Sequence, residues 1–205
     1  MNNNVIICVG RQLGAGGHEI GRMLAQEFNA AYYDRELLNL AAKESGFSEK
    51  FFEENDERKG FLKGLFNVQT AHISGGSLYD SNFSQERLFQ FQSDAIRKAA
   101  AEGPCVFVGR CADYILRDCP GMTSIFITAP FDYRVQQVMN NHGMDANAAR
   151  KFIQHRESVR AEYYNYYTGK KWGQASSYDL CIDASILGAE KTKQLIAEFI
   201  KARMK

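Results

Sequence analysis

The chain has 205 residues, of which 45% are hydrophobic, 24% charged and 12% aromatic. This balance is typical of a folded globular protein and excludes a disordered or fibrous one, and the length suits one well-buried core. Because the formal net charge is only +1, the overall charge indicates neither a nucleic-acid partner nor a membrane partner. Any anion site must therefore be local.

The five cysteines form no CxxC pair. They are predicted to be reduced thiols in a cytoplasmic protein, with metal ligation or a disulfide framework as the alternative. The four histidines do not pair at metal-ligand spacing, so no metal ligand is predicted. The chain starts without a basic segment, and no apolar stretch approaches the ~18 residues of a membrane span. We therefore expect a protein that is neither exported nor membrane-spanning; its oligomeric state is not indicated.

Short apolar runs alternate with helical patterns along the chain. Strands are predicted over residues 5–9, 31–33, 104–109, 123–127 and 178–183. Helices are predicted over residues 18–28, 35–45, 84–101, 133–167 and 189–203, with a short helix capped by Ser48 and a loop over residues 60–83. This alternation predicts an α/β fold in which a five-stranded parallel sheet carries helices on both faces, within a single domain over residues 1–205.

A glycine-rich turn follows the first strand. Residues 10–18 read Gly-Arg-Gln-Leu-Gly-Ala-Gly-Gly-His, which partly matches the phosphate-binding motif G-x-x-x-x-G-K-[ST]. With the second glycine of the motif at Gly16, Gly17 stands in the place of the lysine, His18 in that of the hydroxyl residue, and Arg11 in that of the first glycine. The backbone amides of this turn and of the following helix end predict a phosphate site. Its residues are Gly14, Ala15, Gly16, Gly17 and His18.

One alternative to phosphate binding remains open for this turn. The glycines could serve only to let the strand and the helix pack closely. If the turn does bind phosphate, Arg11 could supply the positive charge that the missing lysine would carry, which is a hypothesis at this stage.

Two charged residues stand at the carboxyl ends of other predicted strands. Arg110 follows the strand over residues 104–109, and Asp34 follows the strand over residues 31–33. Ligands of open parallel sheets bind outside these strand ends, where a guanidinium suits a phosphate or a base. The alternatives are a surface salt bridge for Arg110 and a helix N-cap for Asp34.

Three arginines follow the fourth predicted strand. Arg134 comes soon after that strand, and Arg156 and Arg160 stand four residues apart within a helical pattern, on one helix face. Two neighbouring guanidinium groups repel each other unless an anion lies between them, so this face is a candidate phosphate contact. The alternative is a solvated basic helix, because Glu157 and Glu162 lie nearby.

Taken together, these segments resemble the cytidylate kinase-like family of the nucleoside monophosphate kinases. The resemblance rests on Arg11 and Gln12 with the glycine turn, and on four further segments: residues 33–37, 108–113, 163–172 and 178–180. It implies a three-layer P-loop kinase fold, with a monophosphate-binding insert at about residues 35–100 and a lid at about residues 133–172. ATP and Mg²⁺ would be the cofactors.

The resemblance also implies a role for each candidate residue. Gly14, Gly16 and Gly17 would cradle the donor phosphates, and Asp34 and Arg110 would hold the acceptor nucleotide. The arginines at positions 134, 156 and 160 would stabilise the transferring group, because phosphoryl transfer needs mainly positioning and positive charge.

This sequence departs from the cytidylate kinases at two places, where Gly17 replaces a lysine and Val108 replaces an aspartate. Three functions follow as hypotheses: transfer of the γ-phosphoryl group of ATP to a nucleoside monophosphate, nucleotide binding without catalysis, and phosphorylation of another small acceptor. Small-molecule nucleotides are the expected partners.

Overall fold

The computed structural model describes residues 5–34 and 78–204, with side chains from residue 86 onward in the second range. The predicted helix over residues 35–45 and the short helix capped by Ser48 lie outside the described residues. The elements in chain order are β1 (Ile6–Arg11), α1 (Gly17–Glu27), β2 (Ala31–Tyr33), α5 (Leu78–Glu102), β3 (Cys105–Val108), α6 (Ala112–Ile115), β4 (Met122–Thr128), α7 (Phe131–His142), α8 (Ala146–Thr168), η1 (Ala175–Ser177), β5 (Leu180–Asp183) and α9 (Ala184–Arg203).

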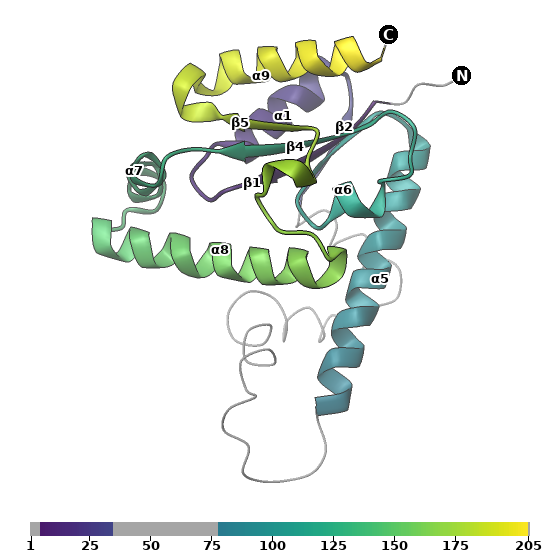
Figure 1. Ribbon diagram of the computed structural model, residues 1–205, viewed down its shortest axis with the longest axis horizontal. Helices are drawn as coiled ribbons and strands as arrows, with labels where there is room; N and C mark the ends of the chain where they lie inside the picture. The colour runs from purple at the N-terminus through teal and green to yellow at the C-terminus, as the bar shows by residue number, and fades with distance from the viewer. Residues whose placement is uncertain (1–4, 35–77, 205) are drawn as a thin grey trace.

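The strands form a five-stranded sheet in the order β2-β3-β1-β4-β5, and all neighbouring strands are parallel. The sheet runs through the upper part of the molecule in Figure 1, with α1 and α9 above it and α5, α6 and α8 below it. The predicted α/β fold with a parallel five-stranded sheet and helices on both faces is therefore confirmed.

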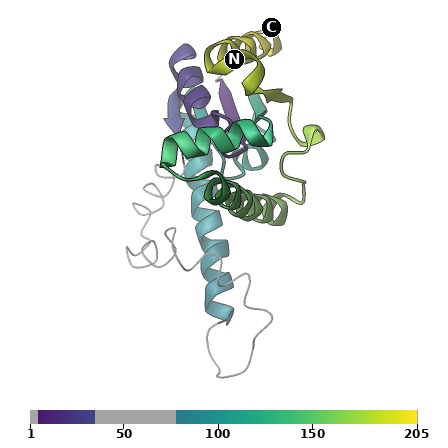
Figure 2. The ribbon, with the colours of Figure 1, turned by 90° about the vertical axis from the view of Figure 1, so that its left-hand side faces the viewer.

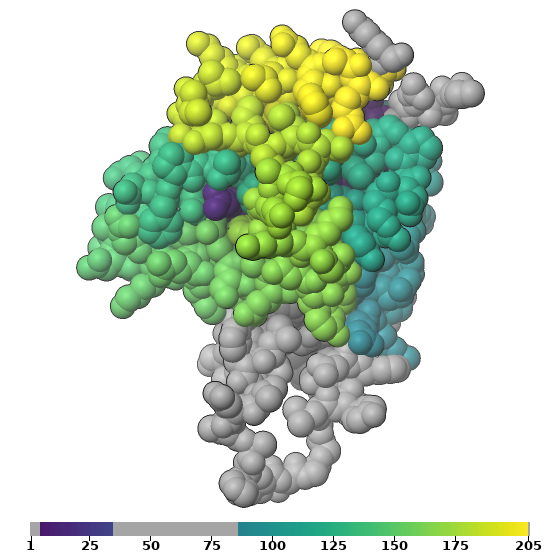
Figure 3. All heavy atoms as spheres, in the orientation of Figure 1, coloured from purple at the N-terminus to yellow at the C-terminus, as the bar shows by residue number. Residues whose placement is uncertain are grey.

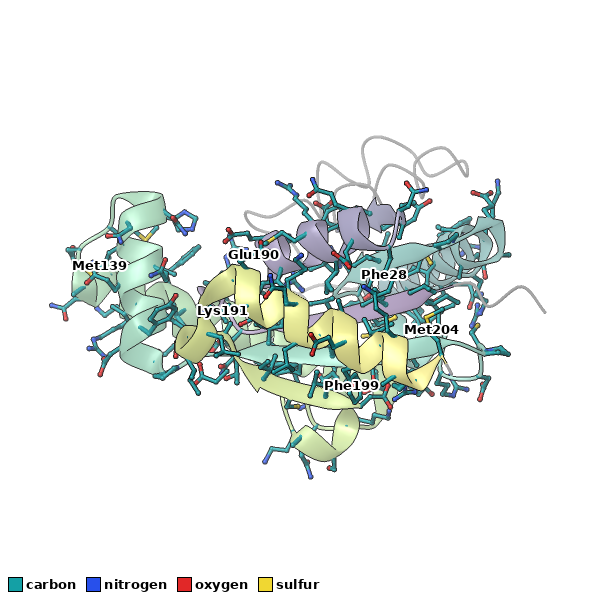
Figure 4. All side chains as sticks on the ribbon, turned by 90° about the horizontal axis from the view of Figure 1, so that it is seen from above. Phe28, Met139, Glu190, Lys191, Phe199 and Met204 are labelled. Atoms are coloured by element: carbon teal, nitrogen blue, oxygen red, sulfur yellow. The ribbon has the colours of Figure 1, made fainter. Side chains whose placement is uncertain are left out.

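The central strand contributes to two cores, because its side chains alternate between the two faces of the sheet. Ile7 and Val9 pack on the face covered by α1 and α9. Ile6 and Cys8 pack on the opposite face, with side chains of α5, α6 and α8. In Figure 4, α1 and α9 lie side by side over the sheet. Burial on both faces explains why β1 reads as an uninterrupted apolar run.

The single helix predicted over residues 133–167 is wrong, because the structure has two helices there, α7 and α8. Gly143 ends α7 in the left-handed conformation, with φ 64°. Asp145 then caps α8, since its carboxylate accepts from the amides of Asn147 at 2.8 Å and Ala148 at 2.9 Å. A glycine that stops one helix and an aspartate that starts the next thus give α7 and α8 different directions (Figure 2).

The predicted loop over residues 60–83 is wrong for its last six positions, because α5 begins at Leu78. Between Leu78 and Glu102 the sequence has no glycine or proline to interrupt a helix. The rest of that loop lies outside the described residues.

The last helix begins at Ala184 rather than at the predicted residue 189. Asp183 caps it, with its carboxylate accepting from the Ser185 amide at 2.9 Å. Gly188 then breaks the helical backbone with φ 73° and ψ 170°, so the first turn of α9 is set off from its main part.

Helix α7 and the first half of α8 share a third apolar cluster, formed by Val135, Val138, Ala149 and Ile153. Leu13, from the glycine-rich turn, packs against this cluster. The helices after β4 are thereby joined to the loop after β1.

All five cysteines are free thiols. Within the part of the chain that the structure describes, no helix has the length and apolar character needed to cross a membrane.

Candidate active site

The carboxyl ends of the five strands meet at one edge of the sheet. In the parallel register Arg11 pairs with Ile127 and Tyr33 pairs with Phe107, so the segments that follow these strands leave the sheet on the same side. The strand order reverses across β1, with β2 and β3 on one side and β4 and β5 on the other. In open α/β sheets such a switch point is where ligands bind.

The glycine-rich turn lies at this switch point. Gly14 and Gly16 take the left-handed backbone conformation, with φ 81° and 80°, which residues with a side chain rarely adopt. Helix α1 begins directly afterwards, at Gly17, so its first amides lack acceptors within the helix. Gln12 ties the turn to the end of β4, because its side-chain oxygen accepts from the Thr128 hydroxyl and, at 3.4 Å, from the Ala129 amide that follows the strand. The turn therefore has the geometry of an anion site.

A pocket of about 290 Å³ lies over this turn. Residues 11–20 line one part of it, and Arg160 of α8 lines another. Its remaining walls come from α7 and from α9, including Tyr133, Gln137, Asn141, Ala184 and Ala189. In Figure 3 N-terminal residues, in purple, reach the surface between α7 and the yellow-green segment before α9. The pocket thus brings together the predicted residues Arg11, Gly14, Ala15, Gly16, Gly17, His18 and Arg160.

Arg134 is buried, with 4% of its surface exposed. Its Nε donates to the carbonyl of Ala129 at 2.9 Å. Its Nη1 donates to the carbonyl of Leu13 at 3.3 Å and to Glu157 Oε1 at 2.7 Å, and the same carboxylate oxygen accepts from the Leu13 amide at 3.1 Å. Arg134 therefore ties the glycine-rich turn to α8. That it also contacts a transferring phosphoryl group stays a prediction.

Gly14 allows this close approach of α7 to the turn. A Cβ on Gly14 would lie 2.7 Å from the carbonyl oxygen of Arg134 and 3.1 Å from its Cα. A side chain at position 14 would therefore push α7 and the turn apart.

Arg11 is the last residue of β1, and its side chain extends into the pocket region. Its Nη2 donates to His18 Nε2 at 3.0 Å, while its Nε is buried and has no hydrogen-bond partner among the described residues. Burial, and then the charges of Arg160 and Arg110, lower the pKa of Arg11 to about 9. The guanidinium is still charged at neutral pH, and the site carries a surplus of positive charge that an anion would relieve.

His18 is held between Arg11 and Tyr32. Because an arginine can only donate, Nε2 of His18 accepts from it, and Nδ1 carries the proton and donates to the Tyr32 hydroxyl at 3.1 Å. Burial, followed by the charges of Arg11 and Arg160, lowers the pKa of His18 to about 4. His18 is exposed to solvent, so water screens these charges to some degree, but the imidazole is neutral at pH 7.

Arg110 lies in a tight turn directly after β3. Gly109, Arg110 and Cys111 all have positive φ, of 82°, 59° and 56°, which is unusual for the latter two. The guanidinium carbon of Arg110 lies 5.7 Å from the centre of the Tyr163 ring, within the range of a cation–π contact. This turn directs Arg110 toward α8.

Helix α8 also contacts α6, the short helix that follows Arg110. The Tyr164 hydroxyl donates to Asp113 Oδ2 at 2.7 Å. Burial raises the pKa of the Asp113 carboxyl, and the Tyr164 hydrogen bond opposes that rise. The bond therefore links α8 to α6, three residues after Arg110.

The two arginines predicted on one face of α8 have different surroundings. Arg160 lines the pocket, and its Nη1 lies 3.5 Å from the carbonyl oxygen of Arg11. Arg156 lies one turn earlier, with its guanidinium carbon 5.2 Å from the centre of the Phe152 ring. Of the arginines predicted after β4, Arg160 is thus the one that the structure brings to the described pocket.

Asp34 directly follows β2 at the same sheet edge and is half-buried. Its negative charge raises the pKa of both Arg11 and His18, opposing the larger effects that lower them. The predicted acceptor-side residues Asp34 and Arg110 therefore both act electrostatically on Arg11.

Sequence reasoning missed several residues that build the site, because they act through long-range contacts. Glu157 is 144 positions away from the Leu13 amide that it binds, and the sequence around Tyr32 predicts only a strand. Asp113 lies within a segment of the resemblance, which implies no role for it. A signal was present for Glu157 alone, since it stands beside Arg156 in a helix otherwise rich in basic residues.

The described residues do not offer Mg²⁺ a ligand at the position that the phosphate-binding motif uses. His18 stands there in place of a hydroxyl residue, and its Nε2 already accepts from Arg11. Among the same residues, no group of three or more His, Cys, Asp or Glu side chains is placed to hold a metal ion.

The sequence profile of the cytidylate kinase-like family matches residues 6–186 of this chain. A cytidylate kinase from Methanopyrus kandleri is 29% identical over 108 residues, which cover 49% of this chain and 56% of that protein. The match thus spans little more than half the length of that curated relative.

Two solved structures share the fold over almost the whole chain. A crystal structure of an uncharacterized protein from Eubacterium ventriosum has a TM-score of 0.74 and 28% sequence identity, covering 96% of this chain and 98% of the other. Shikimate kinase from Bacteroides thetaiotaomicron has a TM-score of 0.55 and 15% identity at the same coverage, which supports the fold alone. With the profile match over residues 6–186, the family predicted from the sequence is confirmed: the chain belongs to the cytidylate kinase-like family.

Proposed function

We propose that this protein is a phosphotransferase that moves the γ-phosphoryl group of ATP to a nucleoside monophosphate, with a cytidylate-like acceptor. The observation that carries the proposal is the meeting of the glycine-rich turn with Arg11 and Arg160 in one pocket, while Asp34 and Arg110 follow strands that end at the same sheet edge. Membership of the cytidylate kinase-like family supports it.

The donor phosphates would lie on the amides of the turn. Arg11 and Arg160 would neutralise their charge, since both line the pocket, and charge-assisted hydrogen bonds to phosphate are strong. The base and ribose of ATP would occupy the part of the pocket between α7 and α9, where Tyr133, Gln137 and Asn141 offer one aromatic and two amide side chains.

The acceptor would lie on the other side of Arg11, with Arg110 on its phosphate and Asp34 on its sugar or base. An oxygen of the acceptor phosphate attacks the γ-phosphorus, the bond from that phosphorus to the β,γ-bridging oxygen breaks, and ADP leaves. The protein supplies position and positive charge. Mg²⁺ would arrive with ATP and neutralise part of the phosphate charge.

The roles of Arg134 and Arg156 differ in this proposal. Arg134 would position the turn through Leu13 and Glu157. Arg156 would reach the transferring group only if α8 moves toward the pocket, because Arg160 is the arginine that lines it.

A second candidate is a nucleotide-binding protein without catalysis. The observation that favours it is the presence of Gly17 and His18 where the motif has a lysine and a hydroxyl residue. Both candidates predict ATP binding and differ only in turnover. A kinase for another small acceptor would bind ATP in the same way and differ in the acceptor.

The test is an assay of the purified protein with ATP, Mg²⁺ and a panel of cytidine, uridine, adenosine and guanosine monophosphates. We expect ADP and a nucleoside diphosphate in equal amounts, with cytidylate among the best acceptors. Arg160→Met should lower kcat by about 100-fold, the usual loss when one group that stabilises transition-state charge is removed. Arg150→Met is the matched control, because Arg150 lies on the same helix and pairs with the exposed Asp132 at 2.6 Å. ATP binding without any diphosphate product would contradict the proposed reaction and leave two candidates, nucleotide binding without catalysis and a kinase for another small acceptor.

A further inference from the structure

The side chain of Arg11 fills the space into which a side chain at position 17 would point. A Cβ on Gly17 would overlap the Cβ of Arg11 and would lie 2.6 Å from its Cγ. Both of these atoms are close to the backbone, so the arginine could not swing away to make room. A lysine at position 17 therefore requires the backbone of the turn or of the end of β1 to shift while position 11 carries a side chain.

The backbone alone does not require glycine at position 17. Gly14 and Gly16 have positive φ, whereas Gly17 starts α1 with an ordinary helical conformation, which residues with side chains readily adopt. The close contact with Arg11 is thus the physical reason for a glycine here.

The far end of Arg11 passes a second glycine. A Cβ on Gly109 would overlap Nη1 of Arg11. Gly17 beside the stem and Gly109 beside the guanidinium form a slot for this side chain, and His18 accepts from its Nη2 at 3.0 Å. The Nε of Arg11 is buried without a partner among the described residues. The charges of Arg160 and Arg110 disfavour the guanidinium more than the charge of Asp34 favours it, so a bound anion would lower the cost of burying it.

We infer that Arg11 and Gly17 are a reciprocal exchange for the glycine and the lysine of the phosphate-binding motif. In that motif the small residue is at position 11 and the cation at position 17; here the cation is at position 11 and the small residue at position 17. Arg11 carries the charge of the missing lysine to the polyphosphate group of the ligand. The inference rests on the proposed function for the identity of that ligand, a nucleoside triphosphate, and not for the anion site itself.

His18 follows as a positioning residue in this arrangement. Its Nε2 lone pair holds the Arg11 guanidinium, and its Nδ1 is fixed by Tyr32. His18, which stands where the motif has a hydroxyl residue, thus orients Arg11.

The contribution of the Arg11 charge to ligand binding is tested with Arg11→Met, which keeps the aliphatic part of the side chain and removes the cation. Binding of inorganic tripolyphosphate and of ATP is measured by calorimetry without Mg²⁺. We expect about 10- to 100-fold weaker binding of both ligands, the usual loss for a charge-assisted hydrogen bond, at an unchanged or higher Tm. Arg97→Met, which removes an exposed arginine paired with Asp94 at 3.3 Å, should leave binding unchanged. Wild-type tripolyphosphate affinity in Arg11→Met would overturn the inference.

The exchange is tested with Gly17→Lys, Arg11→Gly and the double variant that restores both positions of the motif. Gly17→Lys alone should lower the Tm by about 3 to 10 °C through overpacking, and Arg11→Gly alone should lose affinity as Arg11→Met does. The double variant should recover both the Tm and the tripolyphosphate affinity to within about threefold of wild type. Gly103→Ala is the matched glycine control, since a Cβ there meets nothing within 4 Å. A double variant no better than the worse single variant would contradict the exchange.

The positioning role of His18 is tested by rescue. His18→Ala should weaken tripolyphosphate binding several-fold, and His18→Gln, whose amide oxygen can accept from Arg11, should restore most of it. Equal losses of tripolyphosphate affinity in both variants would show that His18 does not position Arg11. If these binding results hold but the wild type phosphorylates no acceptor, the proposed kinase activity fails while the exchange stands.

Discussion

At the residue scale, the arginines of the site differ in the groups that they donate to. Arg134 is paired with Glu157 at 2.7 Å, with side-chain exposures of 5% and 17%. Arg11 donates instead to the imidazole of His18, which carries no charge to offset it. The first arginine therefore stabilises the scaffold, and the second is disposed to meet an anionic ligand.

Glu157→Gln should destabilise the fold by about 3 kcal/mol, because it leaves the buried Arg134 without its counter-charge. The free energy of unfolding is measured by urea denaturation. Asp132→Asn is the control: it breaks the ion pair with Arg150, whose side-chain exposures are 82% and 44%, and should cost under about 1 kcal/mol. Similar small losses in the two variants would mean that the buried pair is not what holds the turn to α8.

The sequence places most candidate residues at the carboxyl edge of the sheet, because strand ends can be predicted from apolar runs. It could not separate Arg134 from Arg160. Both were arginines after the fourth strand, and the difference depends on Glu157 and on the carbonyls of Leu13 and Ala129, which are distant in sequence or belong to the backbone. The contact between Arg11 and Gly17 was likewise hidden, since it depends on the path of the turn.

At the element scale, α8 connects the parts of the site. Its first half packs with α7, and its C-terminal half packs with α5 and α6, where Tyr167 stacks on Phe89 with ring centres 3.9 Å apart. Tyr164 is 5% exposed within the same core. A swing of the whole predicted lid, residues 133–172, would break these contacts, so we expect any closing motion to involve α7 and the first half of α8.

Tyr164→Phe tests how α8 supports the turn that carries Arg110. Loss of the hydroxyl leaves the buried Asp113 carboxyl without its 2.7 Å donor, which should cost about 1–3 kcal/mol of stability. It should also raise KM for the acceptor more than KM for ATP. Steady-state kinetics and urea unfolding measure the two effects. Tyr166→Phe is the control, because Tyr166 is 71% exposed; equal KM changes for both substrates would argue against the link to Arg110.

Strands and helices with a clear apolar pattern were predicted closely. Helix boundaries set by a glycine or by an N-cap were not. The strand over residues 31–33 was predicted with its observed bounds, and α1 was shifted by one residue. The break at Gly143 was missed because the polar and aromatic pattern continues through it, and the early start of α9 depends on the Asp183 cap before the irregular Gly188.

At the scale of the whole molecule, the parallel sheet places the ends of all its strands at one edge, and the glycine-rich turn lies where the strand order reverses. Helices α7 and α8 follow β4 and lie over this edge. Helices α1 and α9 cover one face of the sheet, and Glu27 of α1 joins them because it pairs with Lys193 and Lys201 of α9. The pocket over the glycine-rich turn therefore lies at this edge of the sheet and is lined by residues of α7, α8 and α9. The division into a single domain with an insert at about residues 35–100 stays a prediction.

A crystal structure of the protein with bound ATP tests most directly that this pocket is the donor site. We predict that the β- and γ-phosphates lie within hydrogen-bond distance of the amides of residues 14–18, with the Arg11 and Arg160 guanidinium groups on their oxygens and the base between α7 and α9. ATP bound elsewhere on the protein, or phosphates in the pocket that do not touch Arg11, would contradict this assignment.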